Sequence, residues 1–174
     1  MLKLLNKANN PKVQESEVKV GMAADSRKQM SIELSRCLAD SYYTLMKTQN
    51  LHWNITGPLF FSVHNMTDAQ YKELVDAIDE IAERIRALGM SVPASVPELD
   101  TYTTITELSV GSNPIDMVQS LINDNEHCAR TFRAAAQLAE ELQDLKTADL
   151  LIERIGKHEE SAWMLRALIN IPSQ

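Results

Sequence analysis

The sequence predicts an all-α protein built as one helical domain. Its 174 residues include only five glycines and six prolines, so few positions interrupt a regular helix. Apolar residues recur at intervals of three and four over long segments, which is the spacing of one face of an α-helix. A chain of this length is ordinarily one domain with a substantial core.

Four long helices are expected in order. They cover residues 25–54, 58–88 and 114–143, with the last beginning between residues 144 and 147. Pro58 can occupy the first turn of the second helix without losing a hydrogen bond, and Gly89 is a natural C-terminal stop. Asn113 before Pro114 is an N-cap, and Asp116 then lies favourably on the helix dipole. The residues expected to face the core include Met30, Leu34, Leu38 and Leu45, then Leu74, Ile78, Ile81, Ile85 and Leu88, then Val118, Leu121, Phe132 and Leu142, and finally Leu151, Ile155, Ala162, Leu165 and Ile169.

A long connection separates the second and third helices. Residues 90–112 contain Pro93, Pro97 and many small polar side chains. A connection of this length allows the third helix to run parallel to the second, as in bundles with one crossover connection. A short extra helix is expected within residues 97–102.

The second helix also carries a stripe of potential metal ligands. With Ile81 at zero on a helical wheel, the apolar stripe averages about 20°, because each residue advances about 100°. The other stripe consists of His64, Asp68, Asp79 and Glu83, at about 100°, 140°, 160° and 200°. These side chains should point away from the core of their own chain. His52 lies about as far before the Gly57-Pro58 turn as His64 lies after it, so the two imidazoles should be at similar height.

Distance decides which of these ligands can share an ion. His64 and Asp68 are one helical turn apart, as are Asp79 and Glu83. About 16 Å of helix separates Asp68 from Asp79, so one chain cannot bring the two pairs together. A second copy packed antiparallel about a two-fold axis near Glu73 and Leu74 would place each pair opposite the other. Apolar side chains expected on the same outward face suit such an interface: Phe61, Val75 and Ala82.

Two imidazoles and three carboxylates form a nitrogen-and-oxygen site suited to iron, manganese or zinc. Taken singly, each residue has an ordinary explanation, because outward acids usually form a solvated helix face. The three motifs His52-Trp53, His64-x3-Asp68 and Asp79-x3-Glu83-Arg84 nevertheless agree in residue type and spacing with a known pattern. They resemble the ferroxidase signature of the Dps family, the mini-ferritins of starved bacterial cells.

This resemblance implies a ferritin-like four-helix bundle over residues 25–174, with a short extra helix in the long connection. It also implies a ferroxidase site shared between two subunits, with His52, His64, Asp68, Asp79 and Glu83 as iron ligands. The implied function is oxidation of Fe(II), preferably by hydrogen peroxide, and storage of ferric mineral in a hollow dodecamer built from two-fold dimers. Asp144, Asp149 and Glu153 resemble the acids that line iron-entry pores in Dps assemblies; alternatively, Asp149 simply stabilises the start of the fourth helix.

Charge is distributed unevenly. The first twenty residues carry four lysines and two glutamates, a net +2, which leaves −9 for the rest of a chain whose total is −7. Residues 1–24 are expected to form a flexible basic tail. The Dps resemblance favours contacts between Lys3, Lys7 and Lys12 and DNA phosphates, strengthened by repetition over many subunits and dependent on salt.

Several alternatives remain open. A ferritin with its di-iron site inside one bundle needs Glu-x-x-His on two helices, and no such motif occurs in this sequence. A DNA-compacting structural protein with little ferroxidase activity is the main competing function, and a plain helical oligomer is another. Asp124 and His127 are expected on the surface, and His158 as a hydrogen-bonded core or rim histidine. With two buried cysteines, no signal peptide and no membrane span expected, the protein is expected in the cytoplasm, or at the nucleoid if it binds DNA.

Overall fold

The structure, a computed structural model of the chain, describes residues 18–106 and 113–169. Within these ranges all regular secondary structure is helical, which confirms the predicted all-α class. The elements are α1 (Ala24–Asn54), the 3₁₀ turn η1 (Gly57–Leu59), α2 (Phe60–Ala87), α3 (Val96–Leu99), α4 (Pro114–Glu141) and α5 (Leu145–Ile169). No helix in the described ranges is long and apolar enough to cross a membrane.

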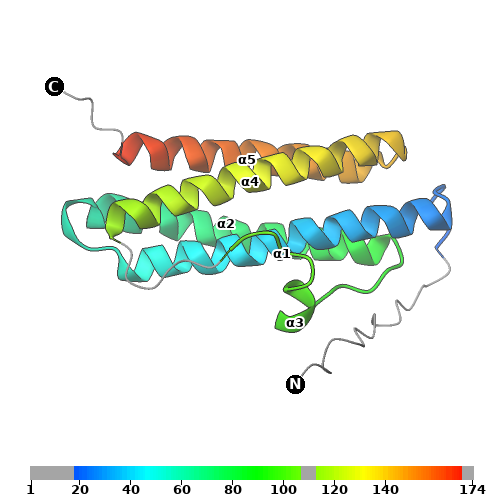
Figure 1. Ribbon diagram of the computed structural model, residues 1–174. Helices are drawn as coiled ribbons and strands as arrows, with labels where there is room; N and C mark the ends of the chain where they lie inside the picture. The colour runs from blue at the N-terminus through cyan, green and yellow to red at the C-terminus, as the bar shows by residue number, and fades with distance from the viewer. Residues whose placement is uncertain (1–17, 107–112, 170–174) are drawn as a thin grey trace, which may run out of the picture.

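The four long helices form two antiparallel pairs, α1 with α2 and α4 with α5 (Figure 1). Following the colours along the chain, α2 and α4 run in the same direction, as expected from the long connection between them. The extra helix α3 lies in that connection, against α1. This is a four-helix bundle with a single crossover connection.

Local sequence signals explain where the helices begin and end. The side chain of Asn113 accepts a hydrogen bond from the backbone N–H of Asp116 at 3.0 Å, which caps α4. Gly89 follows α2 at a φ of +86°, a conformation that favours glycine. Gln143 adopts a φ of +59° just beyond α4, so α4 ends at Glu141 and α5 follows directly.

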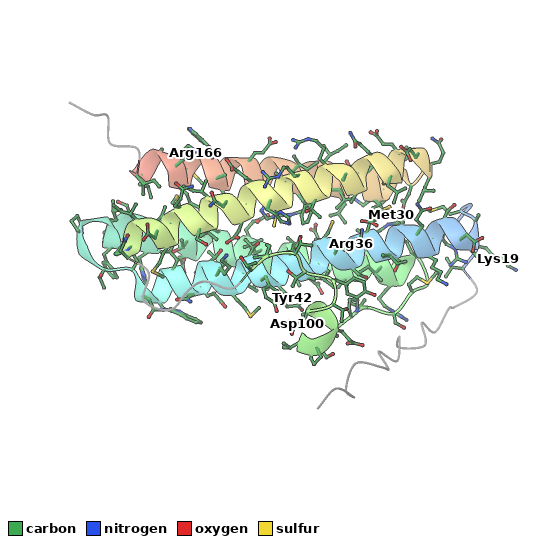
Figure 2. All side chains as sticks on the ribbon, viewed as in Figure 1. Lys19, Met30, Arg36, Tyr42, Asp100 and Arg166 are labelled. Carbon is green, nitrogen blue, oxygen red and sulfur yellow. The ribbon has the colours of Figure 1, made fainter. Side chains whose placement is uncertain are left out.

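The core consists of two apolar halves separated by polar side chains. One half gathers around the completely buried Phe132, and the other around Leu51 and Leu121. Figure 2 shows Met30, a member of the first half, between α1 and the α4–α5 pair. Between the two halves lie eight buried polar residues, which we call the polar layer: Thr44, Lys47, Thr48, Gln70, Asp124, Asn125, Arg154 and His158.

A buried carboxylate forms several of the hydrogen bonds that join the long connection to the bundle. Asp40 of α1 accepts hydrogen bonds from the Thr103 hydroxyl at 2.9 Å and from the Thr104 backbone at 3.0 Å. Nε2 of His127 lies 3.4 Å from the same carboxylate and 2.6 Å from the Thr104 hydroxyl. Nearby, Asp100, which Figure 2 labels beside α3, accepts a hydrogen bond from Tyr43 of α1.

The expectation that Asp124 and His127 lie on the surface is wrong for Asp124, whereas the side chain of His127 is still 33% exposed. Asp124 is buried and forms an ion pair with Lys47 at 2.5 Å, while His127 is half-buried beneath the connection. Burial of the Asp124 carboxyl raises its pKa, an effect that Lys47 opposes. His158 is a hydrogen-bonded core histidine as predicted, and both cysteines are buried and free.

Candidate metal centre

The α1–α2 hairpin brings two imidazoles into contact. His52 lies near the end of α1 and His64 near the start of α2, and their ring centroids are 3.9 Å apart at an interplanar angle of 16°. The turn through η1 places the two rings at the same level, which confirms the height match expected from the sequence.

The backbone fixes the tautomer of both rings. Nδ1–H of His52 donates to the carbonyl of His64 at 2.9 Å, and Nδ1–H of His64 donates to the carbonyl of His52 at the same distance. Thr67 also accepts from His52 at 3.2 Å. Because carbonyls only accept hydrogen bonds, each ring carries its proton on Nδ1 and leaves a lone pair on Nε2. A histidine oriented in this way is prepared to bind a metal through Nε2.

Aromatic side chains hold the pair in place. The ring of Phe60 stacks on His64 with centroids 5.1 Å apart, and Tyr71 approaches His52 edge-on at 5.3 Å. His52 is only 7% exposed, whereas His64 is half-buried. The two rings therefore have little freedom to rotate away from each other.

Asp68 lies one helical turn after His64 and is kept ionised. Lys72 donates to its Oδ2 at 2.7 Å and Tyr71 to its Oδ1 at 3.0 Å. These hydrogen bonds, first that of Lys72 and then that of Tyr71, lower the pKa of the Asp68 carboxyl. A carboxylate that is already deprotonated at neutral pH can bind a cation without first releasing a proton.

Asp79 and Glu83 lie further along α2 and are exposed. Neither makes a side-chain hydrogen bond or ion pair with any residue in the described ranges. Nor do those ranges contain a group of three or more His, Cys, Asp or Glu side chains placed to hold a metal ion. One chain thus separates the predicted ligands into a histidine half and a carboxylate half, as the helix-rise calculation requires. The complete five-residue site stays a prediction.

The outward face of α2 also carries exposed apolar side chains. Phe61 is 77% exposed and Val75 49% exposed, in agreement with an interface on this face. Ala82 differs from the expectation, because it is partly buried and packs against the core of its own chain.

The bundle interior does not resemble a metal site. At the level where an intrabundle di-iron centre would need inward Glu and His ligands, two cationic side chains occupy the polar layer. Lys47 pairs with Asp124, and Arg154 pairs with Glu73. These cations already neutralise the nearby carboxylates, and they would repel a divalent metal ion.

The three acids that resemble pore residues have different surroundings. Asp149 and Glu153 are exposed, whereas Asp144 is buried. Asp144 accepts hydrogen bonds from Arg84 at 2.6 Å and from the Thr147 backbone at 3.1 Å, so it caps the start of α5. The pore requires neighbouring copies of the chain and stays a prediction. The lysines expected to contact DNA, Lys3, Lys7 and Lys12, lie outside the described residues.

Sequence reasoning did not identify the residues that support the candidate ligands. Tyr71 and Lys72 follow Asp68 by three and four positions, and this spacing alone could have indicated their contacts. Thr67 could not be found in the same way, because its partner His52 lies on another helix. Arg84 is part of the resemblance motif, but its contact with Asp144 connects α2 to the start of α5.

Comparison with known proteins identifies the family. The family model of the ferritin-like domain matches residues 33–173. An uncharacterized low temperature-induced protein of Nostoc is 37% identical over 155 residues, covering 87% of this chain and 86% of that protein. DNA protection during starvation protein 2 of Bacillus anthracis is 34% identical, covering 82% of this chain and 98% of that protein.

The fold comparison agrees. The crystal structure of a Dps protein from Vibrio cholerae O1 is described as a member of a broad superfamily of ferritin-like diiron-carboxylate proteins. It superposes with a TM-score of 0.83 at 27% identity, over 89% of this chain and 98% of that chain. The helical bundle, its crossover connection and these relationships together lead to one conclusion: the chain belongs to the Dps family of ferritin-like proteins.

Proposed function

We propose that this protein is a ferroxidase that binds Fe(II) between two subunits, oxidises it preferably with hydrogen peroxide, and stores the ferric product in a hollow homo-oligomer. The observation that carries the proposal is the imidazole pair. His52 and His64 are both fixed with free Nε2 lone pairs, and the ionised Asp68 lies one turn away. Such a half-site has binding groups prepared for a metal ion but too few to enclose one.

The partner subunit would supply the remaining ligands. Asp79 and Glu83 are exposed on the same helix, and an antiparallel copy of α2 would bring them opposite the histidines. Two imidazoles and three carboxylates bind iron while leaving coordination positions for the oxidant. The carboxylates favour the ferric state, so Fe(II) becomes easier to oxidise.

The number of electrons that peroxide accepts sets the ratio of iron to peroxide in the proposed reaction. One hydrogen peroxide molecule accepts two electrons, one from each of two Fe(II) ions, and two protons, and yields two water molecules. Removing Fe(II) and peroxide together in this way suppresses hydroxyl-radical formation. The ferric product would then pass to an acidic inner surface, where carboxylates concentrate cations and nucleate mineral.

Anaerobic Fe(II) titration followed by peroxide tests the activity. The full chain should consume peroxide while ferric absorbance rises, and His64→Ala and Asp79→Ala should each abolish this reaction. Glu80→Ala is the matched control, because Glu80 is an exposed acid on the same helix that points about 100° away from Asp79. Unchanged turnover in both site variants would refute the ferroxidase assignment.

Mixed assembly tests whether the site is shared. When His64→Ala and Asp79→Ala chains are unfolded and reassembled together in equal amounts, half of the dimers should contain one chain of each kind. One of the two sites in such a dimer is intact, so about a quarter of all sites should regain activity. A site formed within one chain predicts no recovery. The mass in solution should be about twelve times the 19.5 kDa of one chain.

A second function, DNA protection by direct binding, is favoured by the name of the Bacillus anthracis relative and by the basic first twenty residues. Gel-shift experiments at low and moderate salt, with and without residues 1–20, test it. Binding should weaken at moderate salt and disappear without the tail, because counterion release drives contacts with phosphates. The proposed location is the cytoplasm. Asp144, Asp149 and Glu153 are proposed to line an iron-entry pore.

A further inference from the structure

A small cavity lies within the polar layer, apart from the candidate iron ligands. Side chains of all four long helices line it, among them Thr48 of α1, Gln70 of α2, Asn125 of α4, and Arg154 and His158 of α5. The space open to the centre of a water molecule is about 10 Å³, close to the 10–15 Å³ that a single buried water requires.

Three buried polar atoms around this cavity lack a hydrogen-bond partner among the described residues. They are Nε2 of Gln70, Nε of Arg154 and Nε2 of His158. Their side chains belong to residues that are 8%, 4% and 1% exposed, respectively. An unpaired buried polar group costs about 1–3 kcal/mol, so three around one cavity point to a shared partner.

The neighbouring hydrogen bonds determine which of these atoms donate. Nδ2 of Asn125 donates to the Leu121 carbonyl at 2.8 Å, so its Oδ1 is the acceptor facing Nδ1 of His158 at 2.9 Å. Nδ1 of His158 therefore carries the proton, and its Nε2 offers a lone pair. Nε2 of Gln70 and Nε of Arg154 can only donate.

We propose that this cavity binds one ordered water molecule, which accepts hydrogen bonds from Gln70 and Arg154 and donates one to His158. A water molecule fits these two donors and one acceptor, because it can both accept and donate hydrogen bonds. A halide would face the lone pair of His158, and this ring stays neutral because burial, together with Arg154, lowers its pKa to about 3. A metal ion would face the positive charge of Arg154. The bound water connects α2 to α5 and, through His158 and Asn125, to α4.

The test is a high-resolution crystal structure of the full chain, with a second crystal soaked in sodium bromide. The native crystal should show one density peak within hydrogen-bond distance of all three atoms, and the bromide crystal should show no anomalous signal there. Absence of a peak would refute the proposal, and so would an anomalous bromine signal, because that would identify an anion site.

A variant tests the role of the amide donor. Gln70→Met preserves the length of the side chain and removes the donor, so the peak should be lost or should move out of reach of residue 70. Gln137→Met, at an exposed position of α4, is the matched control and should leave the peak unchanged. A peak that keeps its position and strength in Gln70→Met would overturn the assigned hydrogen bonds.

Discussion

Replacing Asp144 by alanine should destabilise the protein more than replacing any exposed acid on α5 by alanine would. The Asp144 side chain is 2% exposed and pairs with Arg84, whose side chain is 18% exposed. Its two oxygens also accept hydrogen bonds from the backbone and hydroxyl of Thr147. One carboxylate thus caps α5 and fixes it to α2.

The expected loss follows from these contacts. Removing an N-cap costs about 1 kcal/mol, and a hydrogen bond between charged groups contributes about 1.5–3 kcal/mol. Because Arg84 retains some access to water, the full free-energy cost of leaving a buried charge unpaired does not apply. Asp144→Ala should therefore lower the free energy of unfolding by about 2–4 kcal/mol.

Urea unfolding at one fixed subunit concentration measures this loss, since oligomer dissociation contributes to the apparent stability. Asp149→Ala is the control: its ion pair with Lys146 is exposed, and its loss should change stability by less than about 0.5 kcal/mol. If Asp144→Ala retains the wild-type midpoint but slows iron uptake, the structural role is refuted and the pore role is supported.

Three further predictions concern titratable groups. Burial raises the pKa of Cys128 to about 12, so a thiol reagent at pH 8 should label the unfolded protein much faster than the folded one; equal rates would contradict the buried position. The pKa of His158 is about 3 in the folded state and about 6.5 when unfolded. The unfolded state therefore binds this proton first, and stability should be lost as pH falls from about 6.5 towards 3, by up to about 1.4 kcal/mol per pH unit. His158→Phe should lack this part of the pH dependence in urea unfolding, and parallel curves would show that the ring does not titrate in this way. Finally, Lys72→Gln should raise the pKa of Asp68, because the Lys72 hydrogen bond is the main cause of its low value; carbon-13 NMR titration of the iron-free protein would measure this, and an unchanged pKa would exclude that cause.

Much of the fold could be predicted from the sequence because its signals are local. Asn113-Pro114 marked the start of α4, and Gly89 marked the end of α2. The predicted ends of the long helices lie within about two residues of the observed ones, as expected when caps and turns decide them. The short α3 was also predicted, one residue from its observed start at Val96.

The contacts between helices could not be predicted in the same way. Asp124 looked like a surface residue because its own helix offers only His127 as a partner, whereas Lys47 contacts it from α1. The ion pair of Asp144 with Arg84 was not predicted either, because Arg84 belongs to another helix. The height match of His52 and His64 could be predicted because only a short turn separates them. Which residues meet across the bundle depends on tertiary packing, and spacing along one helix does not encode it.

The position of the polar layer has a consequence for how uniquely the helices align. Sliding α5 by one turn relative to its neighbours would carry Arg154 into an apolar half of the core and would separate it from Glu73. Each such displacement would strand a charge in a hydrocarbon environment, at a cost far above that of the same slip in a uniformly apolar bundle. The buried charges at the centre of the bundle thus favour one axial arrangement of the four helices over arrangements shifted by a turn.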